Sequence, residues 1–308
     1  MRIAAMAAGA VGGYFGARMA AAGHDVFFIA RGTNLAAIKS NGLKLDSVHG
    51  DLHLPKPNVT DDPKSVGPVD IVLFAVKLWD TESAAEQTRP LVGPATRVIT
   101  LQNGVDSVER IAPILGADRT VGGAAYIASV IGSPGVIKQT SHFAKMRFGR
   151  ADKRPDSRLQ AFADAGKAAK IDVDISADID VELWEKFIFL TAMAGSTASM
   201  RAPIGVIRAD PELRGFFRAL MEEAYAVGKA KDVALAPDFI EGRMAFMMNT
   251  VEPGMKASMA HDLERGNRLE LDWLTGKVRA LARALNIPTS ASDTVYTVLK
   301  LHRMGKQA

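Results

Sequence analysis

The chain contains 308 residues, of which 48% are hydrophobic and 23% charged, and it has no cysteine. A single core rarely extends beyond about 250–300 residues, so this length predicts two domains. The formal charge of +4, without dense clusters of Lys and Arg, does not indicate a nucleic-acid partner, and no apolar run reaches the roughly 18–20 residues of a membrane span. The absence of cysteine excludes disulfides and thiolate chemistry, and it favours a cytoplasmic location.

The first thirty or so residues alternate between strand and helix patterns. An apolar run at 2–7 leads into a glycine-rich turn, after which Val11, Phe15 and Met19 recur at helical spacing. A second apolar run, DVFFIAR at 25–31, predicts another strand. This order of strand, glycine turn, helix and strand is the context in which a dinucleotide-binding fingerprint is found.

The fingerprint G-x-G-x-x-G falls on a turn with two of its three glycines. The six positions are Ala7, Ala8, Gly9, Ala10, Val11 and Gly12. In this motif the second glycine lets the backbone approach a pyrophosphate, and the third lets the helix pack on the strand. The first position serves the tight turn, where we expect the methyl group of Ala7 to be tolerated at a negative φ. The alternative is an ordinary strand-to-helix turn.

Arg31, at the end of the second predicted strand, indicates which dinucleotide such a turn would hold. An NAD site usually carries Asp or Glu here to bind the ribose 2′-hydroxyl. An arginine instead suits a 2′-phosphate, through paired charge-assisted hydrogen bonds. The alternative is a solvated arginine at a strand end. The sequence therefore predicts NADPH over NADH.

Two further apolar runs, at 70–77 and 97–104, are typical of strands buried on both faces of a parallel sheet. They end in Lys77 and in Gln102-Asn103-Gly104. Ligands of open α/β sheets bind beyond the carboxyl ends of strands, so Lys77 and Asn103 are candidate site residues. A routine strand-end charge and a simple turn are the respective alternatives. We expect the remaining strands at 135–140, 146–150 and 171–176.

Beyond Ser176 the strand pattern gives way to helices. We expect an α/β domain with a Rossmann-type doubly wound sheet at 1–177 and an all-α domain at 178–308. The predicted helix starts are Asp178 or Asp180, each as an N-cap, and the sequence Asp210-Pro211-Glu212. A third pattern predicts a continuous helix from about 259 to Asn286.

Lys186 and Glu270 are ionisable residues at positions where apolar side chains would be favoured. No charged residue follows Lys186 until Arg201, and burial of an ammonium group is costly unless it is satisfied. Glu270 falls on one stripe of its predicted helix with Leu263 and Leu274. Such groups often mark functional sites. The alternatives are a lysine that snorkels to the surface and a half-exposed structural carboxylate.

Six segments carry a resemblance to a known family. They are AGAVGGYFGARMAAAGHDVFFIAR, FAVK, LQNGV, LWEKF, SMAHDLERGNRLELDWLTG and ALNIPT. In order and spacing the chain resembles the ketopantoate reductase (2-dehydropantoate 2-reductase) family over nearly its whole length. The resemblance implies an N-terminal Rossmann domain, a helical C-terminal domain and NADPH-dependent reduction of a 2-oxo acid to a 2-hydroxy acid. The reaction expected first is 2-dehydropantoate to pantoate, in pantothenate biosynthesis.

The resemblance also implies a role for each matching residue. Lys186 matches the catalytic lysine, which protonates the carbonyl oxygen as hydride reaches the carbon, and a lysine in a dry pocket suits that task. Glu270, which with Lys186 makes up the implied catalytic set, and Ser258 match residues that hold the carboxylate end and the polar groups of the substrate. The implied cofactor-binding set is Ala7, Ala8, Gly9, Ala10, Val11, Gly12, Arg31, Lys77 and Asn103. The implied substrate-binding set is Asn103, Lys186, Ser258 and Glu270.

The pattern departs from the family one and two helical turns after Lys186. Leu190 and Ala194 stand where members usually carry asparagines, so the pocket wall is more apolar. One alternative is therefore a paralogue that reduces another, more apolar 2-oxo acid. A second is a non-catalytic NADPH-binding sensor or partner protein. A third is a β-hydroxyacid dehydrogenase, which LQNGV and Arg31 make less favoured.

Two remaining features concern metals and assembly. His49 and His53 lie in a predicted turn and short strands, which favours surface histidines over a metal site. The Met-rich stretch at 239–251 offers an apolar face for a homodimer through the helical domain, although such a helix is commonly part of the core.

Overall fold

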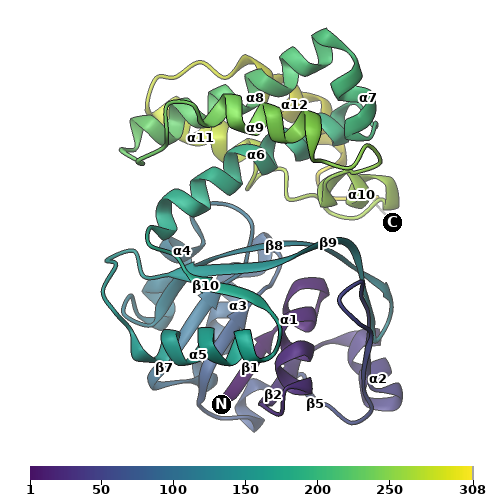
Figure 1. The fold of residues 1–308 in the computed structure, drawn as a ribbon, viewed down its shortest axis with the longest axis vertical. Coiled ribbons are helices and arrows are strands. Elements are labelled where there is room, and N and C mark those ends of the chain that lie inside the picture. Colours follow the sequence, from purple (N-terminus) through teal and green to yellow (C-terminus); the bar gives the residue numbers. More distant parts are fainter. Residues whose placement is uncertain (307–308) are drawn as a thin grey trace. The chain divides into compact units, whose positions relative to one another are not determined.

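The computed structural model describes residues 1–306 (Figure 1). The chain divides into two compact units. The first comprises Met1–Gln102 and Asp106–Glu182, and the second comprises Asn103–Val105 and the chain from Leu183 onwards. The division falls inside one long helix, α6 (Ile179–Ser199), and the short loop segment between the two parts of the first unit belongs to the second.

Within the described residues, one ten-stranded sheet forms the centre of the first unit. Its strands are β1 (Arg2–Met6), β2 (Asp25–Ile29), β3 (Leu43–Asp46), β4 (Leu52–Leu54), β5 (Asn58–Thr60), β6 (Val69–Phe74), β7 (Val92–Thr100), β8 (Thr120–Ser133), β9 (Val136–Gly149) and β10 (Asp172–Ile175). The order across the sheet is β4-β3-β9-β8-β7-β6-β1-β2-β5, and β10 pairs with β9. Neighbours run parallel except in the pairs β8–β9 and β3–β4.

Helices pack on both faces of this sheet. They are α1 (Ala10–Ala21), α2 (Gly32–Asn41), α3 (Thr81–Thr88), α4 (Ser107–Leu115) and α5 (Ser157–Ala168), with 3₁₀ turns η1 (Pro63–Ser65), η2 (Leu78–Asp80) and η3 (Arg89–Leu91). Successive strand residues point to opposite faces. Ile3 of β1 therefore shares one apolar cluster with Phe15 of α1 and Phe162 of α5, whereas Ala4 shares another with Ile111 of α4. The predicted α/β class, with apolar runs buried on both faces, is confirmed.

All the predicted strands belong to this sheet, and two of them form a single strand. The run at 70–77 covers all but the first residue of β6, the run at 97–104 covers the end of β7, and the run at 171–176 contains β10. The segments at 135–140 and 146–150 both belong to β9, a single long strand that pairs along most of its length with β8.

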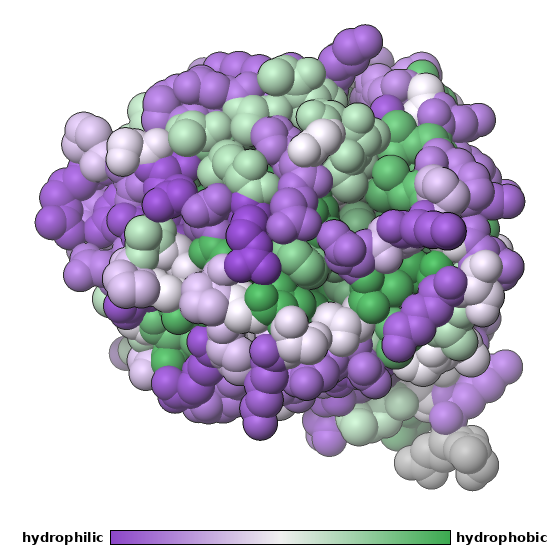
Figure 2. Space-filling model, turned by 90° about the horizontal axis from the view of Figure 1, so that it is seen from below, coloured by the Kyte–Doolittle hydropathy of each residue, from purple (hydrophilic) through white to green (hydrophobic). Residues whose placement is uncertain are grey.

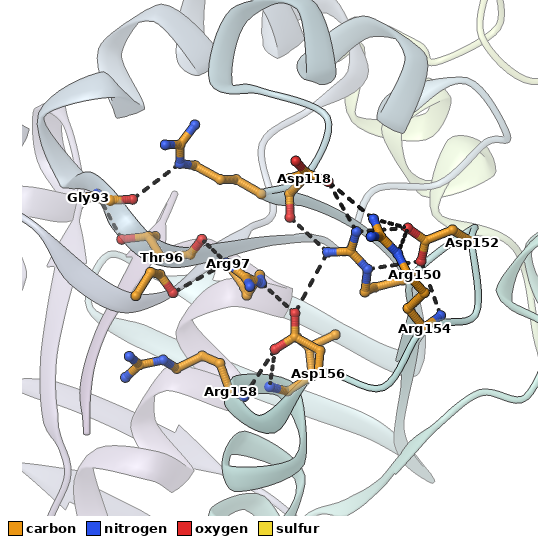
Figure 3. Close-up of polar contacts among 12 residues, drawn as sticks. Gly93, Thr96, Arg97, Asp118, Arg150, Asp152, Arg154, Asp156 and Arg158 are labelled. Carbon is orange, nitrogen blue, oxygen red and sulfur yellow. Dashed lines mark hydrogen bonds and ion pairs between the residues drawn. The ribbon is translucent and has the colours of Figure 1, made fainter.

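An ion-pair network connects the start of α5 to β7 and to the residue that follows β9 (Figure 3). Asp156 is the N-cap of α5, and its carboxylate accepts hydrogen bonds from the amides of Arg158 at 3.0 Å and Leu159 at 3.2 Å. The same carboxylate accepts from Nε of Arg97 on β7 at 2.6 Å and lies 3.7 Å from Arg150. Its side chain is only 6% exposed, so removal of the carboxylate would leave charged partners unpaired in a largely buried place.

We predict that Asp156→Ala lowers the free energy of unfolding by roughly 3 kcal/mol, because it removes both a helix cap and a buried ion pair. The measurement is urea denaturation followed by circular dichroism. Asp118→Ala is the matched control, since Asp118 also pairs with Arg150 but is 86% exposed. That variant should lose less than about 1 kcal/mol. Equal effects of the two substitutions would contradict this account of the network.

The same carboxylate makes stability depend on pH. Burial alone would raise the pKa of Asp156, but the hydrogen bond from Arg97 and those from the amides of Leu159 and Arg158 bring it below the usual value. A pKa that is lower in the folded than in the unfolded chain gives stability that is complete above the unfolded value, about 3.9, and is lost as the pH falls further. The acid-induced loss should therefore be smaller in Asp156→Ala than in the unaltered protein.

The second unit is helical. Beyond α6 its helices are α7 (Ile204–Ala209), α8 (Pro211–Ala230), α9 (Phe239–Asn249), α10 (Ser258–Arg265), α11 (Thr275–Ala284) and α12 (Ser290–Leu299), followed by the 3₁₀ turn η4 (Lys300–His302). The middle of α6 supplies the centre of its core, where residues 191–198 are all buried. Gly195 allows the close approach of α12, because a Cβ there would lie 3.3 Å from a methyl group of Val295. The predicted all-α class of this part is confirmed.

The starts of α8 and α6 follow the predicted capping residues. Asp210 accepts hydrogen bonds from the amides of Glu212 at 2.8 Å and Leu213 at 3.0 Å at the start of α8. Of the two candidates before α6, Asp178 lies at the helix start and accepts from the amide of Val181 at 3.3 Å.

The prediction of one continuous helix from about 259 to 286 is wrong. Gly266, at φ 69, takes the left-handed conformation that ends α10, and its amide and that of Asn267 bond back to carbonyls of the last turn. Residues 267–274 form a connection before α11 begins. Glu270 therefore lies in this connection, and the stripe that it was predicted to share with Leu263 and Leu274 does not exist as a helix face.

Two observations concern the surface. Among residues 1–306, none of the helices has the length and apolar character needed to cross a bilayer. On the face drawn in Figure 2, hydrophilic residues cover most of the surface and hydrophobic ones show in small separate areas. The Met-rich α9 is partly core, because Phe239, Ile240 and Met247 are buried.

Candidate functional site

Four parallel strands of the first unit end in one row. Met6 of β1 pairs with Ile29 of β2 on one side and with Phe74 of β6 on the other, and Phe74 pairs with Thr100 of β7. Neighbouring strands are about 4.8 Å apart, so the loops that follow β2, β1, β6 and β7 emerge side by side. β2 lies on one side of β1 and β6 on the other, so the strand order reverses at β1. In open α/β sheets, ligands bind beyond the carboxyl ends of the strands at such a reversal, so this edge is the expected ligand site.

The turn after β1 has the tight geometry of a phosphate-binding loop, with one strained residue. A Cβ on Gly12 would lie 2.4 Å from the carbonyl oxygen of Ala7, so only glycine fits there. A Cβ on Gly9 would meet no atom within 4 Å, which leaves open space in front of the backbone. Ala7 itself has φ 77. The expectation of a negative φ at Ala7 is wrong, because the turn forces the left-handed conformation on a residue with a side chain.

The start of α1 is suited to an anion. Gly9 is the N-cap, and the amide of Gly13 makes the first helical hydrogen bond to the carbonyl of Gly9 at 2.8 Å. The amides of Ala10, Val11 and Gly12 come before it and have no acceptor within the helix. The first turn carries no acidic residue. Since the helix dipole adds positive potential here, this end can hold a phosphate group.

Arg31 follows β2, one strand away from the glycine turn. It is the N-cap of α2, its side chain is exposed, and its guanidinium donates a hydrogen bond to Oε1 of Gln87 on α3. Asn34, which was not among the predicted site residues, connects this region to two other loops. Its Nδ2 donates to the carbonyl of Ala8 at 3.0 Å, and its Oδ1 accepts from the amide of Gly135 at 2.8 Å. An asparagine in the first turn of the helix after Arg31 is the only local signal of this role.

The loops after β6 and β7 are tied to each other by Gln102. Its buried side chain donates from Nε2 to the carbonyl of Val76 at 3.1 Å and to Oγ1 of Thr81 at 2.9 Å. Lys77, which precedes η2, is exposed, and its Nζ lies 5.6 Å from the ring centre of Trp79. Gly104 has φ 99, so the turn interpretation of Gln102-Asn103-Gly104 describes its backbone correctly. Asn103, the next residue along the chain after Gln102, belongs to the second unit.

In the second unit, Lys186 lies in the second turn of α6 and is half-buried. Leu190 and Ala194 follow it at intervals of four residues, which places all three on one face of the helix. Leu190 is half-buried and packs against the core of this unit, and Ala194 is 1% exposed. Both side chains thus belong to the apolar core of this unit, and their role as a wall of the substrate site stays a prediction.

Glu270 is 6% exposed and lies between two fully buried leucines in the connection from α10 to α11. Its carbonyl accepts from the amides of Trp273 at 3.1 Å and Leu274 at 3.0 Å, which fixes the backbone at this point. Ser258 opens α10 and is exposed. The candidates thus fall into two groups. The first unit holds the turn 7–12, Arg31 and Lys77, and the second holds Asn103, Lys186, Ser258 and Glu270.

The side chains of His49 and His53 each bond to a main-chain carbonyl. Nε2 of His49 lies 2.9 Å from the carbonyl of His142, and Nε2 of His53 lies 3.0 Å from that of Asn41. Both side chains are exposed.

A doubly wound sheet with a glycine turn at its carboxyl edge, joined to a separate helical unit, defines a Rossmann-type oxidoreductase. The chain matches the family described as ketopantoate reductase PanE/ApbA over residues 3–153, and its C-terminal counterpart over residues 178–303. It therefore belongs to the ketopantoate reductase family. A 2-dehydropantoate 2-reductase of Mesorhizobium japonicum is 31% identical to it, over 97% of each chain. An uncharacterized oxidoreductase of Bacillus subtilis, YkpB, is 28% identical over 99% of this chain and 100% of its own.

Solved structures agree with this assignment. The 2-dehydropantoate 2-reductase of Geobacter metallireducens superimposes with a TM-score of 0.91 at 30% identity, covering 98% of this chain and 99% of the other. A D-mandelate dehydrogenase solved with NADH and anilino(oxo)acetate superimposes with a TM-score of 0.90 over 98% of each chain. Its identity is 18%, so it shows a shared fold alone.

The strain at Ala7 is testable. We predict that Ala7→Gly raises the free energy of unfolding by about 0.5–1 kcal/mol, because relief of the left-handed conformation outweighs the added flexibility of the unfolded chain. Denaturant unfolding measures this difference. Ala8→Gly is the matched control and should destabilise the protein, since Ala8 is buried and does not have a positive φ. A loss of stability in Ala7→Gly would show that the turn is not strained.

Proposed function

We propose that the protein is an NADPH-dependent reductase of a 2-oxo acid, with 2-dehydropantoate as the first candidate substrate and Lys186 as the general acid. The observation that carries this proposal is the half-buried Lys186 on α6, in the same compact unit as Asn103, Ser258 and Glu270. We assign residues 1–177 to cofactor binding and residues 178–308 to the substrate. Membership of the ketopantoate reductase family and the reductase named in Mesorhizobium japonicum support the reaction class.

The first unit fits a dinucleotide at its carboxyl edge. The open space at Gly9 admits a pyrophosphate close to the backbone, where the amides at the start of α1 bind its oxygens. Arg31 is one strand away, and we assign it to the 2′-phosphate, which makes NADPH the cofactor. Lys77 and Asn103 then bind near the nicotinamide and the reacting carbonyl. The bound NADPH supplies the hydride.

The residues of the second unit supply the proton and the substrate contacts. Nζ of Lys186 donates a hydrogen bond to the ketone oxygen, stabilises the negative charge that develops there, and transfers a proton to it. Ser258 and Asn103 hydrogen-bond the polar groups of the oxo acid. Glu270, fixed in a buried connection, holds a substrate hydroxyl or the lysine itself in position. The helix face beyond Lys186 forms the apolar wall beside the side chain of the substrate.

The direct test is oxidation of NADPH, followed at 340 nm, with a panel of 2-oxo acids that differ in their side chains. We predict that Lys186→Ala lowers kcat by about 10²–10⁴-fold, the usual contribution of a positioned acid. Its affinity for NADPH should stay within a factor of about two, because Lys186 is assigned to the substrate. If Lys186→Ala keeps most of the turnover, the assignment is wrong. If the unaltered chain binds NADPH but reduces no oxo acid, the protein is a sensor instead.

Arg31 determines cofactor choice in this proposal. We predict that Arg31→Ala raises the KM for NADPH at least about tenfold, because it loses charge-assisted hydrogen bonds to the 2′-phosphate, and changes the KM for NADH little. Lys39→Ala, an exposed lysine on α2, is the control for loss of one positive charge nearby. Equal increases of KM for the two cofactors in Arg31→Ala would contradict this role.

A second candidate is a reductase of a different, more apolar 2-oxo acid. Leu190 and Ala194 favour it, because the asparagines usual in this family would hydrogen-bond a hydroxylated substrate and these side chains do not. The panel separates the two candidates by the ratio of kcat/KM for an alkyl or aryl 2-oxo acid to that for 2-dehydropantoate. A homodimer through the helical unit stays a prediction, for which the exposed Met248 at the end of α9 offers one contact.

A further inference from the structure

A hollow of about 310 Å³ lies wholly within the helical unit. It is lined by the C-terminal end of α6, by α10 and the residues after it, and by the chain near residues 302–306. Thr197, Ala198 and Ala260 are almost completely buried and form the closed part of its wall. Its volume is at the lower limit of small-molecule pockets, which range over about 300–1,000 Å³.

The charges around this hollow are mainly positive. The cationic side chains that line it are Arg201 and Lys306, and Glu264 is the one acidic residue among the lining side chains described. The carboxylate of Glu264 accepts a hydrogen bond from Nζ of Lys256 at 2.5 Å, which holds its pKa below the usual value. The charge of Glu264 is thus balanced by Lys256, which is outside the lining. Arg201 and Lys306 remain as an excess of cationic groups.

Arg201 has a backbone conformation that is unusual for a residue with a side chain. It follows the end of α6 with φ 51, a conformation that glycine usually supplies after a helix. In the part of the chain that the structure describes, its guanidinium makes neither a hydrogen bond nor an ion pair. The planar group therefore has all five donors available at the wall of the hollow, and a guanidinium matches the oxygens of a phosphate or carboxylate in pairs.

Gly305 and Lys306 form another part of the wall. The amide of Lys306 donates to the carbonyl of Gly266 at 2.8 Å. Only glycine fits at position 305, because a Cβ there would lie 2.7 Å from that carbonyl oxygen. A Cβ on Gly266 would lie 2.6 Å from Cγ of Lys306. Both glycines have positive φ, so the backbone is shaped to bring Lys306 to the rim.

We propose that this hollow binds a small ligand with a phosphate or carboxylate group, held between Arg201 and Lys306. The site is distinct from the residues assigned to reduction. Thr197 follows Lys186 by eleven residues along α6, a distance of about 16 Å at 1.5 Å per residue. On α10, the lining residues Ala260 and Glu264 are on the side of the helix away from Ser258, at about 100° per residue. A bound anion at this place therefore occupies neither the proposed substrate site nor the cofactor site.

Isothermal titration calorimetry with inorganic pyrophosphate and, separately, with citrate tests this site and distinguishes phosphate from carboxylate ligands. We expect saturable binding of at least one probe. Arg201→Gly should weaken it at least about tenfold, the usual loss for charge-assisted hydrogen bonds. This variant suits the left-handed backbone, so it should fold as well as the unaltered protein, which a thermal melt checks.

Two matched controls remove one positive charge elsewhere. Arg265→Ala changes α10 at an exposed arginine outside the lining, and Arg31→Ala changes the proposed cofactor site. Both should bind the probe within about a factor of two of the unaltered chain, since neither group contacts it. The proposal is overturned if neither probe binds, if Arg201→Gly binds as well as the unaltered chain, or if Arg31→Ala abolishes binding. The last outcome would place the anion at the cofactor edge without affecting the assignment of Arg31.

Discussion

The parallel register of β2, β1, β6 and β7 is the constraint on which the assigned cofactor site depends. Because Met6, Ile29, Phe74 and Thr100 end their strands in one row, four loops that are far apart in the sequence emerge at one edge. A shift of one strand by a single residue would turn its buried side chains to the other face, so the apolar clusters on both faces hold the register. The register of these strands therefore determines which edge of the sheet we assign to the cofactor.

At the assigned sites, one residue with a side chain has a left-handed backbone and two polar side chains are buried. The left-handed conformation at Ala7 costs roughly 1–2 kcal/mol in an L-residue, and it persists because Gly12 packs directly against the carbonyl of the same residue. Gln102, though buried, is satisfied by three polar partners that join two loops of the row. In the helical unit, Glu270 is buried in a connection rather than on a helix. These placements are costly for stability alone, which is consistent with a functional role.

Local patterns in the sequence were enough for some elements, whereas α2 to α5, α7, α12 and β8 were not predicted. The two-faced strands, the helix after the glycine turn and the start of α8 at Asp210 all follow from apolar periodicity and capping residues. The break at Gly266 could not be foreseen, because an isolated glycine is tolerated in a helix and its contact with Lys306 comes from the far end of the chain. The φ of Ala7 was likewise set by packing against Gly12.

The candidate site was predictable to a smaller extent. Residues that end strands or interrupt apolar helices, such as Arg31 and Lys186, have a signal in the sequence. Asn34 and Gln102 act through hydrogen bonds to Ala8, Val76 and Thr81, which lie 21 or more positions away, and no local pattern reveals them. The membership of Asn103 in the helical unit is also a tertiary property. The family resemblance groups Asn103 with Lys186, but no local pattern does.

The central claim is that the ammonium group of Lys186 meets the ketone oxygen of the substrate. A crystal structure of the protein with NADP⁺ and oxamate, an unreactive analogue of a 2-oxo acid, tests it most directly. The account predicts Nζ of Lys186 within about 2.6–3.2 Å of the oxygen that occupies the ketone position, beside the nicotinamide ring. A complex in which this amine points into solvent, or in which another cation contacts that oxygen, would contradict the account.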